Sequence, residues 1–308
     1  MTSTSSKLRR RQGRNWRRLI VSGIAIATAV LVIFTQLHRV EAQGSSLGEL
    51  SSSSLPAPQT HPLPATLAQW HSTGTGDYVS QVKPTPVGYL VWSQFPVKVY
   101  VERPTDPTES SPSVRRFQEW VNAVLKAVEE WNVYLPLEVV TQPATADISI
   151  LRSRPPLQAS FNRETGQFNL PRARSAETRY EFYLRPAVDA SNPILSHRFT
   201  IQLSPDQTVE YTMATARHEL GHALGIWGHS PLETDTMYFS QVRNPPPISA
   251  RDINTLKRVY EQPTRLGWRL ISTKGKSLKD WHTGHRGQSS LLILRIQPKP
   301  MSDRNLKA

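Results

Sequence analysis

The sequence contains no cysteine among its 308 residues. Disulfide bonds and thiolate metal sites are therefore excluded, and the fold must rest on an apolar core and on any metal held by histidine or carboxylate side chains. The length is sufficient for one well-buried domain with appendages.

Acidic residues are scarce at both ends of the chain, whose formal net charge is +13. Residues 1–18 carry seven Lys or Arg and no acid, and residues 263–308 carry ten basic and two acidic residues. The residues between them are left close to neutral. We therefore expect no nucleic-acid partner, because the basic charge is confined to the two tails. The basic C-terminal extension, 263–308, is predicted to be solvated and to contact anionic lipid or cell-wall polymer.

Long apolar runs are absent except for one uncharged stretch, Leu19–Leu37. As a helix it would span about 28 Å, close to the hydrocarbon thickness of a bilayer. The positive flank at Arg17 and Arg18 predicts a cytoplasmic N-terminal tail (1–18) and export of everything that follows the span. We expect a single-pass membrane protein with an exported catalytic domain. The alternative is secretion after cleavage near Ala42.

Aliphatic residues are also sparse in residues 38–87, which are rich in Ser and Pro and predict a spacer without its own fold. The folded domain is expected to span 88–262. Its patterns predict strands at 97–101, 137–140, 146–150, 180–184 and 197–203, and helices after Ser111, Val209 and Ser249. The buried face of the second helix is predicted to be Val209, Met213, Ala216, Leu220 and Leu224.

These elements predict an α+β fold, with a mixed twisted sheet and three main helices, preceded by one transmembrane helix. Residues 152–197 are mostly irregular, apart from one clear strand.

The motif that carries chemistry is H-E-x-x-H, with His218, Glu219 and His222. On a helix, residues four apart emerge from one face, so the two imidazoles can share one ion, and neutral nitrogen ligands suit zinc. Glu219 would stand beside the metal as a general base for a bound water. Gly225 can end the helix in a left-handed conformation, and His229 can then return as a third ligand.

Met237 follows eight residues after His229. The combination resembles the metzincin metalloproteases, whose motif H-E-x-x-H-x-x-G-x-x-H precedes a Met-turn, and it is most similar to the matrixin branch. The resemblance covers roughly 88–262. It implies one catalytic zinc, Met237 as an apolar floor beneath the histidines, and Tyr238 and Phe239 as one wall of a substrate pocket. It also implies an edge strand that pairs with substrate.

The sequence departs from the family pattern at one position. The third histidine would be expected at 228, where this chain has Gly228, and it stands instead at 229. We expect Gly228 to absorb the extra residue through backbone angles that other residues avoid. Glu233 and Asp235 remain alternative third ligands. A carboxylate from a later helix, Glu261, would leave Gly225, His229 and Met237 unexplained.

Other histidines are isolated in the sequence and are expected to be structural or solvated. No motif supports a structural calcium or a second zinc. The histidines in question are His61, His71, His197, His282 and His285.

The sequence therefore predicts a zinc-dependent endopeptidase that acts on protein or peptide substrates and is monomeric. The alternative is a non-catalytic, zinc-stabilised envelope-binding protein. The intact Glu219 speaks against that alternative, because a structural metal site needs no base at this position.

Overall fold

The computed structural model describes residues 55–271, except 73, 107, 158–159, 163–165, 170–173, 188 and 190–191, together with 292–294. In this part of the chain, no helix is long and apolar enough to cross a membrane. The predicted anchor at 19–37 lies outside the described residues, as do the predicted cleavage site at Ala42 and the two histidines of the C-terminal tail, His282 and His285.

One mixed sheet organises the fold, with strand order β2-β1-β3-β7-β6-β8. The first four strands in this order run parallel to one another, whereas β6 is antiparallel to both of its neighbours. The strands are β1 (Val97–Val101), β2 (Leu137–Val140), β3 (Ile148–Leu151), β6 (Ala176–Arg185), β7 (Ile194–Leu203) and β8 (Leu292–Leu294). All the predicted strands are present, although β6 and β7 begin earlier than their apolar patterns suggested. A mixed sheet is the architecture expected from the sequence.

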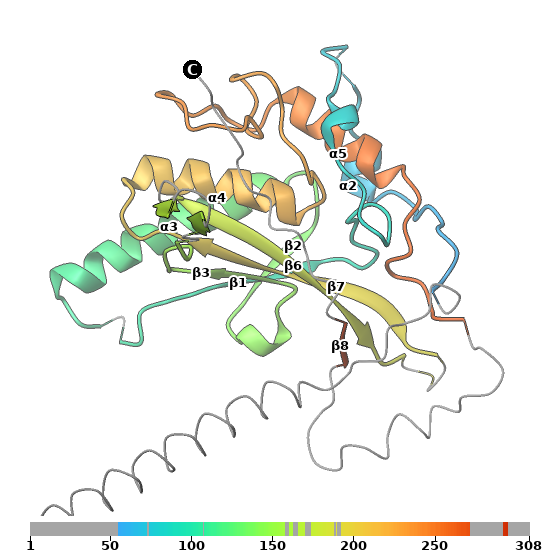
Figure 1. Ribbon diagram of the computed structural model, residues 1–308, viewed down its shortest axis with the longest axis horizontal. Helices are drawn as coiled ribbons and strands as arrows, with labels where there is room; N and C mark the ends of the chain where they lie inside the picture. The colour runs from blue at the N-terminus through green and yellow to red at the C-terminus, as the bar shows by residue number, and fades with distance from the viewer. Residues whose placement is uncertain are drawn as a thin grey trace, which may run out of the picture. The chain divides into compact units, whose positions relative to one another are not determined.

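Three main helices accompany the sheet: α3 (Pro112–Asn132), α4 (Val209–Ala223) and α5 (Ala250–Tyr260). Figure 1 shows α3 and α4 side by side over one face of the sheet. They are joined where Trp131 Nε1 donates to the carbonyl of Arg217. Strand β7 shows why the sheet needs this cover, since its side chains alternate between buried and half-buried along all ten residues. The buried side of the strand, including Phe199 and Ile201, belongs to the core under the helices.

The helix starts follow their local capping chemistry. Ser111 accepts a hydrogen bond from the amide of Val114 and so caps α3. Ser249 and Asp252 form the predicted capping box of α5. Helix α4 is capped by Thr208. The prediction that Val209 lies on the buried face of α4 is wrong, because its side chain is 53% exposed at the first helical position.

The segment before the predicted domain is part of the fold, and the linker prediction is wrong for residues 55–87. This segment contains α2 (Ala65–Ala68) and the short 3-10 helix η2 (Val79–Gln81). Figure 1 shows it running alongside α5. It contributes four buried apolar side chains to the core: Leu67, Tyr78, Val82 and Val87. The composition of this segment predicted a linker because it has too few apolar residues for a core of its own. These residues are buried instead against the core that the other elements form.

The start of the predicted C-terminal extension is also folded. Thr264 and Leu266 are buried, and the backbone of Thr264 exchanges two hydrogen bonds with Gln59, at 3.0 and 2.9 Å. The prediction of a solvated extension is therefore wrong for residues 263–271. Further along, the short strand β8 pairs with β6. The irregular region before β6 contains a small hairpin, β4 (Ser160–Asn162) and β5 (Gln167–Asn169), and a 3-10 turn, η3 (Pro143–Thr145), precedes β3.

Candidate metal centre

Helix α4 presents two histidines on one face, as their spacing predicted. His218 Nδ1 lies 2.8 Å from the carbonyl oxygen of Thr236, and His222 Nδ1 lies 2.8 Å from that of Ile226. A carbonyl oxygen only accepts, so both Nδ1 atoms carry the proton. In a neutral imidazole this leaves the lone pair on Nε2, which is the form that binds a metal. The protein thus fixes the tautomer of both rings before any ion binds.

The chain then turns so that a third histidine faces the helix. Gly225 follows the last helical turn with φ of 133°, a conformation that favours glycine. A Cβ at this position would also lie 3.1 Å from the carbonyl oxygen of Leu90. The prediction that Gly225 ends the helix is confirmed.

Gly228 is needed for a different reason from the one the sequence suggested. It is not among the glycines with positive φ. A Cβ there would instead meet the backbone of the N-terminal segment, 2.3 Å from the carbonyl oxygen of Gln81. The residue that lengthens the family spacing is therefore a point of close backbone approach, and His229 follows it directly.

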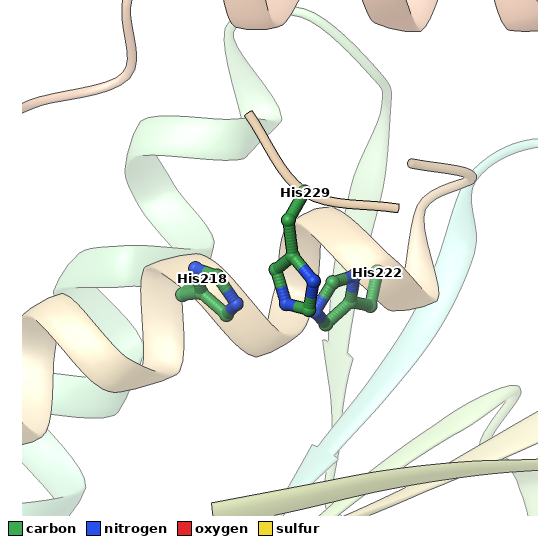
Figure 2. A group of neighbouring side chains, drawn as sticks. All are labelled: His218, His222 and His229. Atoms are coloured by element: carbon green, nitrogen blue, oxygen red, sulfur yellow. The ribbon is translucent and has the colours of Figure 1, made fainter. Parts of the chain in front are cut away.

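The three imidazoles converge, as Figure 2 shows. The ring centroid of His218 lies 4.7 Å from that of His222 and 5.3 Å from that of His229, and the last two are 4.9 Å apart. One ligand atom from each residue lies within 4.8 Å of the others, so the cluster could hold a metal ion. Within the described residues, no other group of three or more His, Cys, Asp or Glu side chains has this geometry.

Burial favours the neutral, metal-binding form of two of these rings. It lowers the pKa of His229 to about 3, assisted by the charges of His218 and Lys83. It also lowers the pKa of His222 well below its ordinary value, again with help from the two neighbouring histidines. Metal binding requires deprotonated ligands, so at neutral pH these side chains are ready to bind without first losing a proton.

Glu219, on the same helix as His218 and His222, is linked to the sheet by a hydrogen bond. Its Oε2 accepts a hydrogen bond of 2.5 Å from the hydroxyl of Thr178, on β6. This contact ties the predicted base to the antiparallel strand and fixes the orientation of its carboxylate. Thr178 was missed in the sequence because its strand was predicted to start at residue 180. The only signal for it in the sequence is that Thr178 is β-branched, which favours extending the predicted strand by two residues.

Met237 is fully buried against α4. A Cβ at Gly221 would lie 2.2 Å from Met237 Sδ, so the glycine between the two helical histidines makes room for the sulfur. This places Met237 beside the helical turn that carries the ligands, where an apolar floor was expected. The rings of Tyr238 and Phe239 are 4.4 Å apart, and Phe239 is 41% exposed. Their role in a substrate pocket remains a prediction.

The alternative third ligands are engaged elsewhere or lie apart from the cluster. Asp235 is buried and accepts hydrogen bonds from Ser230, Ser249 and Arg251. Glu233 is exposed, and Glu261 forms an ion pair with Arg258 at the end of α5. The geometry therefore favours His229 over these three alternatives.

Two of the isolated histidines are structural. His61 lies 2.8 Å from the carbonyl oxygen of Leu266 and stacks on Trp268. His197 is buried against the ring of Trp92, and burial lowers its pKa to about 3. His71 is exposed on the surface.

No protein-family model matches this sequence, and a comparison with curated proteins finds no significant match.

Proposed function

We propose that the protein is a zinc-dependent endopeptidase of the metzincin type. The observation that carries the proposal is the convergence of three histidines, two of them with fixed tautomers, next to a glutamate held on the same helix. A metal site used only for stability has no need of a carboxylate adjacent to a ligand.

The donor set fits zinc better than it fits calcium or magnesium. Neutral imidazole nitrogens suit zinc, whereas calcium and magnesium prefer oxygen ligands. Three protein ligands leave a fourth tetrahedral position open, which is typical of catalytic zinc sites, while structural sites are usually closed by four protein ligands. Zinc, when bound, would lower the pKa of a water in that position towards ~7 and polarise the substrate carbonyl.

Glu219 acts as the general base in this proposal. It takes the proton of the attacking water and later delivers it to the leaving amine. The hydrogen bond from Thr178 holds the Glu219 carboxylate in one orientation. The same oriented carboxylate then serves in both proton transfers. His218 and His222 keep their orientation because their Nδ1 protons are bound to backbone carbonyls.

The sheet supports an extended peptide as the substrate. Thr178 lies on β6, and β8 pairs with β6 only at residues 182–184. Among the described residues, no strand pairs with the first part of β6 on that side. A strand edge that no described strand pairs, close to the base, can align a substrate strand through backbone hydrogen bonds. We propose that protein segments bind there, with Tyr238 and Phe239 lining the pocket beyond the cut bond.

We further propose that residues 19–37 anchor this domain to a membrane, with the catalytic part on the exported side. The apolar run and its arginine flank support this placement. Extraction of membranes with alkaline carbonate tests it, since an anchored chain stays in the pellet and a secreted chain does not.

The decisive experiment is digestion of an unbiased peptide mixture by the purified full-length chain, with and without a zinc chelator. Glu219→Gln should keep zinc and lose cleavage. The matched control is Glu210→Gln, an exposed glutamate in the first turn of the same helix, which should cleave normally. Cleavage by the Glu219→Gln chain would refute the mechanism. Zinc bound one to one without any cleavage would favour the zinc-stabilised envelope-binding protein.

A further inference from the structure

Asp252 is a buried carboxylate on which three segments of the chain meet. It is 0% exposed and forms no ion pair with any described residue. Its oxygens accept from the Tyr78 hydroxyl at 2.5 Å, the Thr236 amide at 2.9 Å and the Ser249 amide at 2.8 Å. Burial raises the pKa of Asp252, and the hydrogen bonds from Tyr78, Ser249 and Thr236 oppose that rise. Burial and the charge of Asp252 raise the pKa of Tyr78 well above its ordinary value, so the phenol keeps its proton and donates.

One of these segments leads directly to the metal centre. Thr236 donates its amide to Asp252, and its carbonyl accepts from His218 Nδ1 at 2.8 Å. The amide in the same peptide group as that carbonyl, Met237 N, donates to Asp252 Oδ1 at 3.4 Å. The Tyr78 hydroxyl and the Met237 amide thus donate to the same oxygen of Asp252, and the carbonyl of that Thr236–Met237 peptide orients His218. A shift of the carboxylate would move the peptide that orients His218.

The same N-terminal stretch reaches the other two ligands. We call residues 78–83 the N-terminal strap. The amide of Lys83 donates to the carbonyl of Trp227 at 3.0 Å, and the backbone of Gln81 lies against Gly228. Trp227 follows the residue whose carbonyl orients His222, and Gly228 precedes His229. The strap thus contacts, directly or through Asp252, the backbone segments that position all three histidines.

We propose that Tyr78 is a positioning residue for the metal centre, and that the N-terminal strap sets zinc affinity from a point 140 residues before the first ligand in the sequence. The inference rests on the metal site of the proposed function. Ligands held in place by hydrogen-bonded neighbours bind metal more tightly, because less ordering remains to be done on binding.

The test compares two variants of the same N-terminal segment in the full-length chain. Tyr78→Phe removes the hydroxyl that donates to Asp252 and should lower zinc affinity about tenfold, measured by competition with a chromogenic chelator. Trp70→Phe is the matched control. It removes a hydrogen bond of 2.9 Å from Trp70 Nε1 to Asn254 on the same helix α5. The Asn254 side chain otherwise donates to Thr75 and Gly76, away from Asp252 and Thr236. Its zinc affinity should equal that of the unmodified chain.

A purely structural role predicts a different pattern. Zinc affinity would then follow the loss of stability in both variants, and equal losses in Tyr78→Phe and Trp70→Phe would overturn the proposal. Unchanged zinc affinity in Tyr78→Phe would overturn it as well. The double variant Tyr78→Phe with Asp252→Asn should lose no more zinc affinity than Asp252→Asn alone, since both act through one carboxylate.

A second variant keeps the proposal testable if Tyr78→Phe does not fold. Thr255→Val removes the acceptor of the Tyr78 amide, 3.0 Å away, and leaves the phenol and Asp252 in place. It should lower zinc affinity in the same direction, and unchanged affinity would count against the strap. If the unmodified chain binds no zinc, the proposed function fails. If it binds zinc and the variants bind equally well, only this inference fails.

Discussion

Replacing Gly228 with alanine tests how the third histidine is held. A Cβ at this position would lie 2.3 Å from the carbonyl oxygen of Gln81, 2.8 Å from its carbonyl carbon and 2.9 Å from Val82 Cα. All three are backbone atoms, so no side-chain rotation relieves the contact. Ordinary contact begins near 3.4 Å, and the strap must therefore move by about 1 Å.

The expected cost can be worked out from these contacts. In open space the substitution would stabilise the protein by about 0.4–1 kcal/mol, because alanine restricts the unfolded chain. Overpacking against backbone costs about 1–3 kcal/mol. Losing the hydrogen bond between the Lys83 amide and the Trp227 carbonyl costs about 0.5–1.5 kcal/mol more. We therefore expect Gly228→Ala to lower the free energy of unfolding by about 0.5–4 kcal/mol and to weaken zinc binding through His229.

Urea denaturation of the metal-free chain measures the first effect, and chelator competition measures the second. Gly166→Ala is the control, since Gly166 has φ of 66° and no atom within 4 Å of a built Cβ. It should cost only the strain of a positive φ, about 1–2 kcal/mol, with zinc affinity unchanged. Stability of Gly228→Ala equal to or above that of the unmodified chain would refute the packing argument. Adding Gln81→Ala should not rescue the variant, because the clash is with backbone.

Three further predictions concern ligation, acid stability and helix packing. Loss of a hydrogen-bond partner of a metal ligand typically weakens metal binding about 10–100-fold. His229→Ala removes a ligand itself and should weaken zinc binding by more than this. An unchanged zinc content would mean that another group is the third ligand. His197 has a folded pKa of about 3, below its unfolded value. The unfolded state therefore binds the proton first, and stability that is complete above pH ~6.5 falls towards pH 3 by up to about 1.4 kcal/mol per unit. His197→Phe should flatten this fall in urea denaturation between pH 7 and 4, and an unchanged slope would contradict the assignment. Glu130→Gln should lower the free energy of unfolding by about 1–3 kcal/mol, because it removes the charge that faces the buried Arg217. Glu129→Gln is the control, since its ion pair with Lys126 is exposed, and it should change the free energy of unfolding by no more than about 0.5 kcal/mol. Equal losses in the two variants would argue against a contribution from the buried pair.

Much of the fold was predictable because its signals are local. Ser111 caps α3 through an amide three residues away, and Ser249 and Asp252 cap each other across the same distance. Alternation over five residues was enough to locate β1. The extent of β6 was not predictable in this way, since its first residues, including Glu177 and Thr178, are polar. Those residues are buried only because other parts of the chain pack around them.

The sequence by itself determined the helical part of the metal centre. Four residues separate His218 from His222, and helical geometry places both on one face whatever surrounds them. Only the tertiary structure decided what fixes and completes this arrangement. Thr178 reaches Glu219 across 41 residues of sequence, and Tyr78 reaches Asp252 across 174. Such contacts depend on how segments far apart in the sequence pack around a shared core, and a short stretch of sequence contains no information about that packing. The same reason explains why residues 55–87 resembled a linker: their few apolar side chains are buried by a surface that the rest of the chain provides.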